Sequence, residues 1–204
     1  MLGVATAVVI LGASIAPFLA PPVVRFEQDR SGAGALTGFT TAQLDAVTGS
    51  LLGDLVLWGG DFAVAVDGVP VLKDAERSHM RDVRTVFTGF WLIVLAGAVI
   101  LLAGFRRAGL AEARAEVLRV VRNGARGLAV AIVVAGAFAI VAFDAAFELF
   151  HRLFFSAGSY TFDPRSDRLV QLFPEQFWSE IAFAVGVVVL GASIVTARLA
   201  GTRT

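Results

Sequence analysis

The segment from Val86 to Phe105, VFTGFWLIVLAGAVILLAGF, contains no acidic or basic side chain. A bilayer core about 30 Å thick needs roughly 20 apolar residues to be crossed by a helix. Three further stretches are similarly apolar, at residues 2–24, 127–150 and 177–198. Backbone polar groups in lipid must be satisfied within their own segment, so each stretch predicts a transmembrane helix. The expected fold is therefore an all-α membrane protein, a bundle of four transmembrane helices.

Composition agrees with this class. Hydrophobic residues make up 57% of the 204 residues and charged residues 17%, against about 25% charged in a typical soluble domain. The 17 basic residues balance the 17 acidic ones, so no excess charge points to a nucleic-acid partner. The absence of cysteine excludes disulfides, thiolate metal sites and a cysteine nucleophile.

The arginines indicate orientation. Residues 106–126 contain six arginines against two glutamates, and cytoplasmic loops carry such an excess. Both termini are therefore expected in the cytoplasm. The first span is expected to be retained, because no Lys or Arg precedes it as in a signal peptide. The predicted organisation is transmembrane helices at 1–24, 85–105, 127–150 and 177–198, extracytoplasmic segments at 25–84 and 151–176, a cytoplasmic basic loop at 106–126 and a cytoplasmic tail at 199–204.

The extracytoplasmic segment 25–84 is expected to be small and α+β. Residues 30–38 are rich in Gly and Ala and predict a loop, whereas residues 40–52 have helical spacing with Thr40 or Thr41 as the N-cap. Two short apolar runs flank Asp67-Gly68, a pair typical of the tight turn of a β-hairpin.

The chain has two histidines, and each lies where a predicted outer segment meets a span. Two carboxylates stand at helical spacing near each of them: Glu76 and Asp82 around His79, and Asp144 and Glu148 before His151. Carboxylates near lipid are costly and normally face the bundle interior or a wet cavity. We therefore expect one joint site, with Arg152 as a neutralising partner or a headgroup anchor.

Several chemistries fit these residue types. Two imidazoles suit acid–base catalysis, because histidine titrates near neutral pH. Together with Glu76 and Glu148 they could also hold zinc, although no His-Glu-x-x-His element is present. Ser78 and Ser156 lie near the histidines but lack the Gly-x-Ser-x-Gly of a serine hydrolase. An ion-paired helix start with interfacial histidine anchors is the non-catalytic alternative.

Two segments around the histidines resemble the signatures of a known family. Residues 76–83, ERSHMRDV, resemble the Glu-x-x-His-Met-x-Asp-Val signature of the lipoprotein intramolecular transacylase (Lit) family. Residues 147–155, FELFHRLFF, with the later runs 162–164, 167–170 and 173–178, resemble its second signature. Tyr160 stands where many members have Trp.

The resemblance implies a cofactor-free enzyme of the bacterial cytoplasmic membrane that works at the outer leaflet, among membrane lipids. Its substrate would be a diacylated lipoprotein, whose sn-2 acyl chain moves from the glycerol to the α-amine of the terminal cysteine. His79 and His151 would share the proton transfers. The implied supporting residues are carboxylates that steady the imidazoles and donors to the oxyanion: Glu76, Asp82, Asp144 and Glu148, with Arg152 and Tyr160. The alternatives are a metal-dependent membrane hydrolase and a non-catalytic four-span module.

Overall fold

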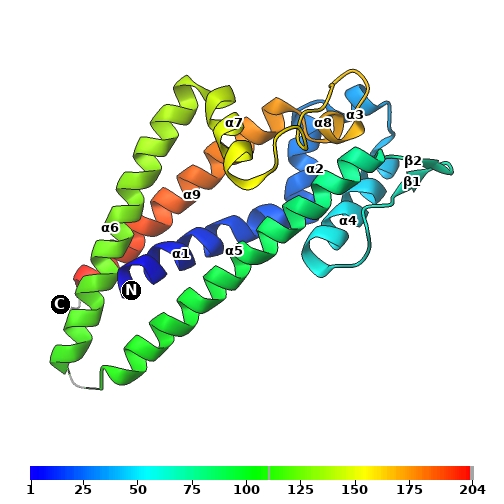
Figure 1. Cartoon of the computed structure of the whole chain (residues 1–204). Coiled ribbons are helices and arrows are strands. Elements are labelled where there is room, and N and C mark those ends of the chain that lie inside the picture. The colour runs from blue at the N-terminus through cyan, green and yellow to red at the C-terminus, as the bar shows by residue number, and fades with distance from the viewer. Residues whose placement is uncertain (110, 203–204) are drawn as a thin grey trace. The chain divides into compact units, whose positions relative to one another are not determined.

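The computed structural model describes residues 1–109 and 111–202, which are mostly helical and include one two-stranded ribbon (Figure 1). The elements are α1 (Leu2–Ile15), the 3₁₀ helix η1 (Ala16–Leu19), α2 (Pro21–Arg30), α3 (Ala33–Thr37), α4 (Thr41–Leu57), β1 (Ala65–Val66), β2 (Val69–Pro70), α5 (Asp74–Arg107), α6 (Ala111–Val141), α7 (Phe143–Phe154), α8 (Arg168–Leu172) and α9 (Glu175–Gly201).

Four helical segments of the described residues are long and apolar enough to cross a membrane. They are Leu2–Leu19, Asp74–Arg107, Ala113–Val141 and Glu175–Gly201. Only 6% of the most apolar window of α5 is buried within the chain, so its apolar side chains face outward, as lipid requires. The prediction of a four-span, largely helical membrane protein is confirmed.

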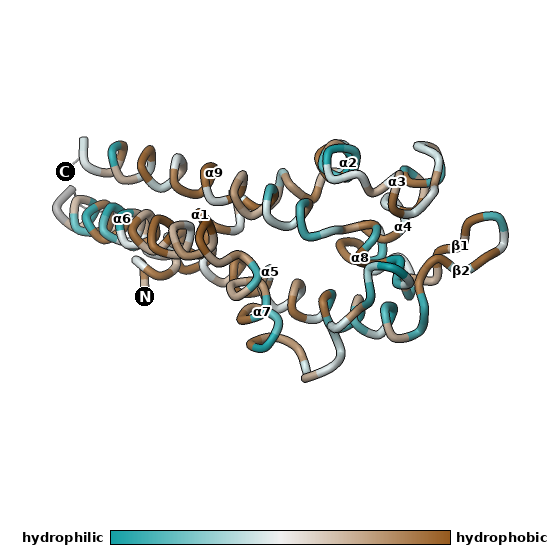
Figure 2. The backbone as a smooth tube through the Cα atoms, turned by 90° about the horizontal axis from the view of Figure 1, so that it is seen from above, coloured by the Kyte–Doolittle hydropathy of each residue, from teal (hydrophilic) through white to brown (hydrophobic). Residues whose placement is uncertain are grey.

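The chain forms two compact units. The first comprises residues 1–17, 89–142 and 183–204, and the second comprises residues 18–88 and 143–182. In Figure 2, α6 changes from hydrophilic near its start, where the arginines lie, to hydrophobic further along. By these ranges the first unit contains most of the apolar residues of the four spans, and the second unit contains both histidines.

Helices α1 and α6 of the first unit approach each other at glycines. A Cβ atom added to Gly124 would lie within 2.8 Å of the Cα of Gly3. Gly97 of α5 is similarly close to α1, since an added Cβ would be 3.3 Å from the carbonyl oxygen of Ala5. Small residues allow the backbones of membrane helices to pack closely. These contacts therefore require glycine, which has no side chain, at positions 97 and 124.

Replacing Gly124 by alanine is expected to destabilise the first unit by about 1–3 kcal/mol, because the added methyl group overpacks a backbone contact. The measurement is the midpoint of thermal unfolding in detergent. Gly127, one turn further along α6, has open space around its Cβ position. Gly127→Ala should be neutral or stabilising by up to about 1 kcal/mol through helix propensity. Equal midpoints for the two variants would contradict the close contact.

The second unit has its own hydrophobic core. Leu44, Val47 and Leu51 of α4 bury the face that their helical spacing predicted, against Phe62 and Leu172. The α4 capping box is formed as expected, with Thr40 accepting from the Gln43 backbone and its own N–H bonded to the Gln43 side chain.

A buried amide links three helices of this unit. The side chain of Gln28 on α2 donates to the carbonyl of Leu172 on α8 at 3.1 Å. It also accepts a hydrogen bond from Thr48 of α4 at 2.7 Å. Because both ends of the buried amide are satisfied, it fixes α2 against α4 and α8 without a desolvation penalty.

Two predictions for the outer segment had different outcomes. The hairpin is present but short, and Asp67 and Gly68 at its turn have φ angles of 51° and 79°, as a type I′ turn requires. The loop predicted for residues 30–38 is wrong, because those residues include α3. Glycines with positive φ at 32 and 38 flank this helix, so they delimit a helical turn instead of an irregular loop.

The span boundaries also differ from the expected ones. Pro21 and Pro22 end the first apolar stretch but at once begin α2, because proline is well tolerated in the first turn of a helix. The stretch 127–150 is not one helix, since α6 ends at Val141 and α7 begins at Phe143. The basic segment 106–126 is not a separate connector, because α6 begins at Ala111 and runs through it, and the helical spacing of Val117, Leu118 and Val121 favours this form, with Val117 and Val121 buried.

Candidate active site

The two histidines meet within the second unit. His79 on α5 and His151 on α7 are separated by 72 positions in the sequence, yet their ring centroids lie 6.0 Å apart with 23° between the ring planes. Both side chains are buried, with exposed fractions of 6% and 9%. The two histidine segments therefore lie together, as the sequence predicts.

Aromatic rings surround the pair. Phe155 contacts both imidazoles, with centroid distances of 4.8 Å to His79 and 5.4 Å to His151. Other rings pack against single imidazoles: Phe162 at 5.6 Å from His79, and Phe147 at 4.2 Å, Tyr160 at 5.1 Å and Phe150 at 5.5 Å from His151. Nothing in the local sequence distinguishes these imidazole contacts from lipid contacts, because aromatic side chains are also enriched at membrane boundaries.

The hydrogen bonding of His151 determines its tautomer. Its Nδ1 lies 2.8 Å from the carbonyl oxygen of Phe147 on the same helix. A carbonyl oxygen can only accept, so Nδ1 carries the proton and Nε2 of the neutral ring keeps its lone pair. His151 thus presents a basic nitrogen whose direction is set by the backbone of α7.

His79 is bonded differently. Its Nδ1 is buried and has no hydrogen-bond partner among the described residues. A buried polar atom without a partner costs free energy unless a water or a bound molecule supplies the missing hydrogen bond. The nitrogen is therefore available to a bound molecule.

Glu76 lies near His79 in sequence, but its carboxylate has other partners. The side chain is fully buried. One oxygen accepts the backbone N–H of Lys73 at 2.7 Å, and the other accepts that of Leu169 at 2.6 Å. Glu76 therefore joins the first turn of α5 to α8, three residues before His79.

The remaining predicted carboxylates lie on the surface. Asp82 and Asp144 are exposed, and Glu148 is exposed and paired with Arg152 at 2.6 Å. On α7, Glu148 and Arg152 thus pair with each other at the surface instead of with an imidazole. Of the predicted site residues, the structure brings His79, His151 and Tyr160 together.

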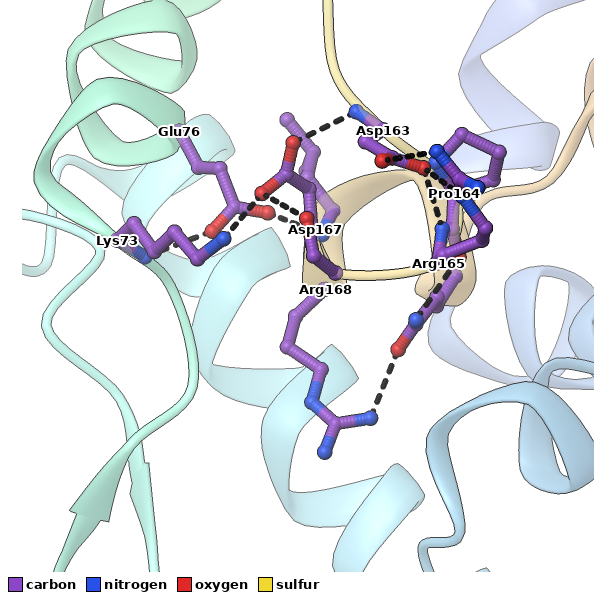
Figure 3. A network of polar contacts seen from close by, with 10 residues as sticks. Lys73, Glu76, Asp163, Pro164, Arg165, Asp167 and Arg168 are labelled. Carbon is purple, nitrogen blue, oxygen red and sulfur yellow. Dashed lines mark hydrogen bonds and ion pairs between the residues drawn. The ribbon is translucent and has the colours of Figure 1, made fainter.

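A second ionic contact holds the same two segments together (Figure 3). Lys73 pairs with Asp167, and this hydrogen bond raises the pKa of Lys73 and lowers that of Asp167. Asp167 also accepts the backbone N–H of Asp163 at 2.7 Å. The segment that carries Phe162 is thereby fixed against the start of α5, next to His79.

The same histidines and carboxylates are also candidate ligands for a metal ion. Within residues 1–109 and 111–202, no group of three or more His, Asp or Glu side chains is arranged to hold a metal ion.

Glu76→Gln is expected to lower the free energy of unfolding by about 1–3 kcal/mol, because the amide NH₂ would face a buried backbone N–H. Thermal unfolding in detergent measures this loss. Glu148→Gln is the matched control, since it breaks a surface ion pair worth at most about 1 kcal/mol. A Glu76 variant as stable as the Glu148 variant would show that the buried carboxylate does not join the two segments.

Acid should weaken the second unit. The guanidinium of Arg81 lowers the pKa of Asp61, and hydrogen bonds from Arg165 and Lys73 lower the pKa values of Asp163 and Asp167. Each folded pKa lies below the ordinary 3.8. This stabilisation is therefore fully present above that value and is lost as pH falls through the folded values.

Thermal unfolding compared at about pH 6 and about pH 3 checks this sign, because the unfolded chain takes up protons first. Asp167→Asn removes one of the three titrating carboxylates, so its midpoint should fall less between the two conditions. An equal fall in the variant and the native chain would contradict the assigned contribution.

Comparison with known proteins identifies the family of the chain. The family model described as lipoprotein intramolecular transacylase Lit matches residues 1–178. The chain belongs to this family. The family resemblance seen in the histidine segments is thus confirmed, and the chain is placed among membrane acyltransferases.

Solved structures of the Lit transacylase from Bacillus cereus share the fold. One aligns with a TM-score of 0.79 at 21% identity and covers 99% of this chain and 92% of the other. Two variants with a histidine replaced by arginine or alanine each align with a TM-score of 0.71 at 21% identity. They cover 99% and 98% of this chain, and 88% and 89% of their own. No curated protein sequence matches the chain significantly.

Proposed function

We propose that this Lit family member transfers the sn-2 acyl chain of a diacylglyceryl-cysteine lipoprotein to the α-amine of the same cysteine. The observation that carries the proposal is the stacked pair of buried imidazoles, 6.0 Å apart, one with an available nitrogen and the other with a fixed tautomer. The product is a lyso-form lipoprotein with an N-acyl chain.

The reaction balances without a cofactor. The amine nitrogen attacks the ester carbonyl carbon, a carbon–nitrogen bond forms, and the bond to the glycerol oxygen breaks. The amine loses one proton and the glycerol oxygen gains one. Because both reacting groups belong to one molecule, the protein mainly positions them, which can contribute roughly 7–11 kcal/mol to lowering the barrier.

The tautomer suggests how the histidines divide the proton transfers. Nε2 of His151 has the lone pair, and its Nδ1–H bond to the Phe147 carbonyl would stabilise the imidazolium formed when it takes the amine proton. The His151 imidazolium would then pass its proton to His79, and His79 would give a ring proton to the departing glycerol oxygen, so that both rings return to their starting state. The buried, aromatic surroundings strengthen the hydrogen bond of His151 to the Phe147 carbonyl by excluding water.

The other predicted residues have lesser proposed roles. Glu76 acts as a positioning residue, because its buried carboxylate fixes the turn before His79. Tyr160 packs beside His151, where its phenol could donate to the oxyanion. The exposed side chains of Asp82, Asp144, Glu148 and Arg152 would shape the charge around the entrance for the lipid headgroup.

The proposed location follows from charge. The arginine-rich segment 106–126 and both termini would face the cytoplasm. Each histidine lies at the end of its span that is remote in sequence from the arginine-rich segment. The site would therefore open toward the outer leaflet of the cytoplasmic membrane. A diacylated lipoprotein would be presented on that side.

Replacing either histidine should reduce the reaction by about 10²–10⁴-fold, the usual contribution of a general acid or base. The variants are His79→Gln and His151→Gln, which keep a polar side chain but cannot carry protons near neutral pH. The measurement is mass spectrometry of lipoprotein N-terminal peptides from cells that lack other N-acylation. The native chain should move one acyl chain from glycerol to nitrogen.

Two controls separate this proposal from its alternatives. Ser78 is exposed and adjacent to His79, so Ser78→Ala should keep full activity, whereas a serine hydrolase would lose it. Purified protein should also stay active in EDTA, whereas a metal-dependent hydrolase would not. Native-rate conversion by either glutamine variant would overturn the acid–base role of that histidine.

A further inference from the structure

The loop after α4 exposes two large apolar side chains. Leu57 ends the helix with 78% of its surface exposed, and Trp58 follows with 58% exposed. Burying such side chains is favourable by tens of calories per Å², so their exposure in a loop indicates a covering partner.

The backbone of this loop is strained as well. Trp58 has φ 56° and ψ 36°, the left-handed conformation that helix ends usually give to glycine. Two glycines follow at once, at 59 and 60, yet the tryptophan takes the left-handed position. Strain of this kind persists where surrounding contacts fix it, and it is found at functional positions.

Those contacts come from one face of α5. The Arg84 guanidinium lies over the Trp58 ring at 4.5 Å and over the Phe62 ring at 5.0 Å. It also donates to the carbonyl of Gly60 at 2.7 Å. Cation–π contacts and this hydrogen bond fix the loop to α5 but leave the outer side of the tryptophan uncovered.

Two further arginines extend this attachment. Arg77 and Arg81 both pair with Asp61, at 2.6 Å and 3.1 Å. With Arg84 they stand at i, i+4 and i+7 of α5, so three successive contacts join the loop to one helix face. The loop is therefore held rigidly at a defined position along α5.

That position coincides with the membrane boundary. Arg84 is two residues before the apolar stretch 86–105, so its contact with Trp58 places the loop where α5 enters the bilayer. Tryptophan is enriched at this depth because its ring is amphipathic, and arginine extends its charged group toward the headgroups.

We propose that Leu57 and Trp58 form a membrane anchor, inserted at the boundary between headgroups and acyl chains on the side where α5 begins. The anchor would hold the second unit at a fixed depth. Since Arg84 is five residues after His79, it would also fix the depth of that imidazole. This inference does not rest on the proposed reaction.

The chain has no native cysteine, so single cysteines can carry a nitroxide label. Leu57→Cys labels the proposed anchor, and Val69→Cys labels the hairpin, where the native valine is 66% exposed. In nanodiscs, electron paramagnetic resonance compares collisions with oxygen, which enriches in lipid, and with a water-soluble nickel chelate. The oxygen-to-nickel ratio should be several-fold higher at position 57 than at 69.

A second variant tests the tryptophan itself. Adding Trp58→Ala to Leu57→Cys should lower the oxygen-to-nickel ratio toward that of position 69, whereas Trp58→Phe should retain part of it. Equal ratios at positions 57 and 69 would overturn the anchor. So would dipolar broadening between labels at position 57 in discs that hold two copies, because the loop would then be covered by another chain.

Discussion

Two backbone N–H groups, from segments 96 positions apart, share one buried carboxylate. Glu76 accepts from Lys73 and from Leu169, and the Leu169 donor would otherwise be buried without a partner. This pair of bonds holds the start of α5 against the segment that carries Phe162. The ion pair of Lys73 with Asp167 repeats the connection at the surface. The position of His79 among its aromatic neighbours depends on both.

The histidine site is mostly apolar, and this determines what it can do. Aromatic rings pack against both imidazoles, whereas in a catalytic triad a carboxylate orients the ring and stabilises the imidazolium that forms. Phe155 packs against both rings and keeps them nearly parallel. A lipid ester can enter such surroundings without losing favourable contacts, whereas the amine becomes easier to deprotonate away from water.

The sequence predicted the features that local chemistry determines. Long uncharged stretches identified the spans, Thr40 and Gln43 identified a capping box, and Asp67-Gly68 identified the hairpin turn. The break after Val141 has no proline or comparable signal, so hydropathy extended that helix too far. The short α3 helix was not predicted, because the glycines that flank it resemble those of a loop.

The site could be predicted only in part, because some of its contacts join residues that are far apart in the sequence. Two histidines at corresponding ends of their spans pointed to one site, and the family signatures strengthened that expectation. Helical spacing also placed Glu76 on the face of His79, which suggested an imidazole partner. Its actual acceptor role depends on Leu169, a partner 93 positions away that no local pattern reveals.

The hydrogen bond of His151 has a consequence for how this protein tolerates sequence change. Its acceptor is a main-chain oxygen one helical turn earlier, so any amino acid at position 147 supplies it while α7 stays helical. The tautomer of the ring is therefore fixed by the backbone of the helix, and no other side chain is needed to set it. Divergent relatives can vary the surrounding aromatic residues, and so the shape offered to an acyl chain, without disturbing which nitrogen is basic.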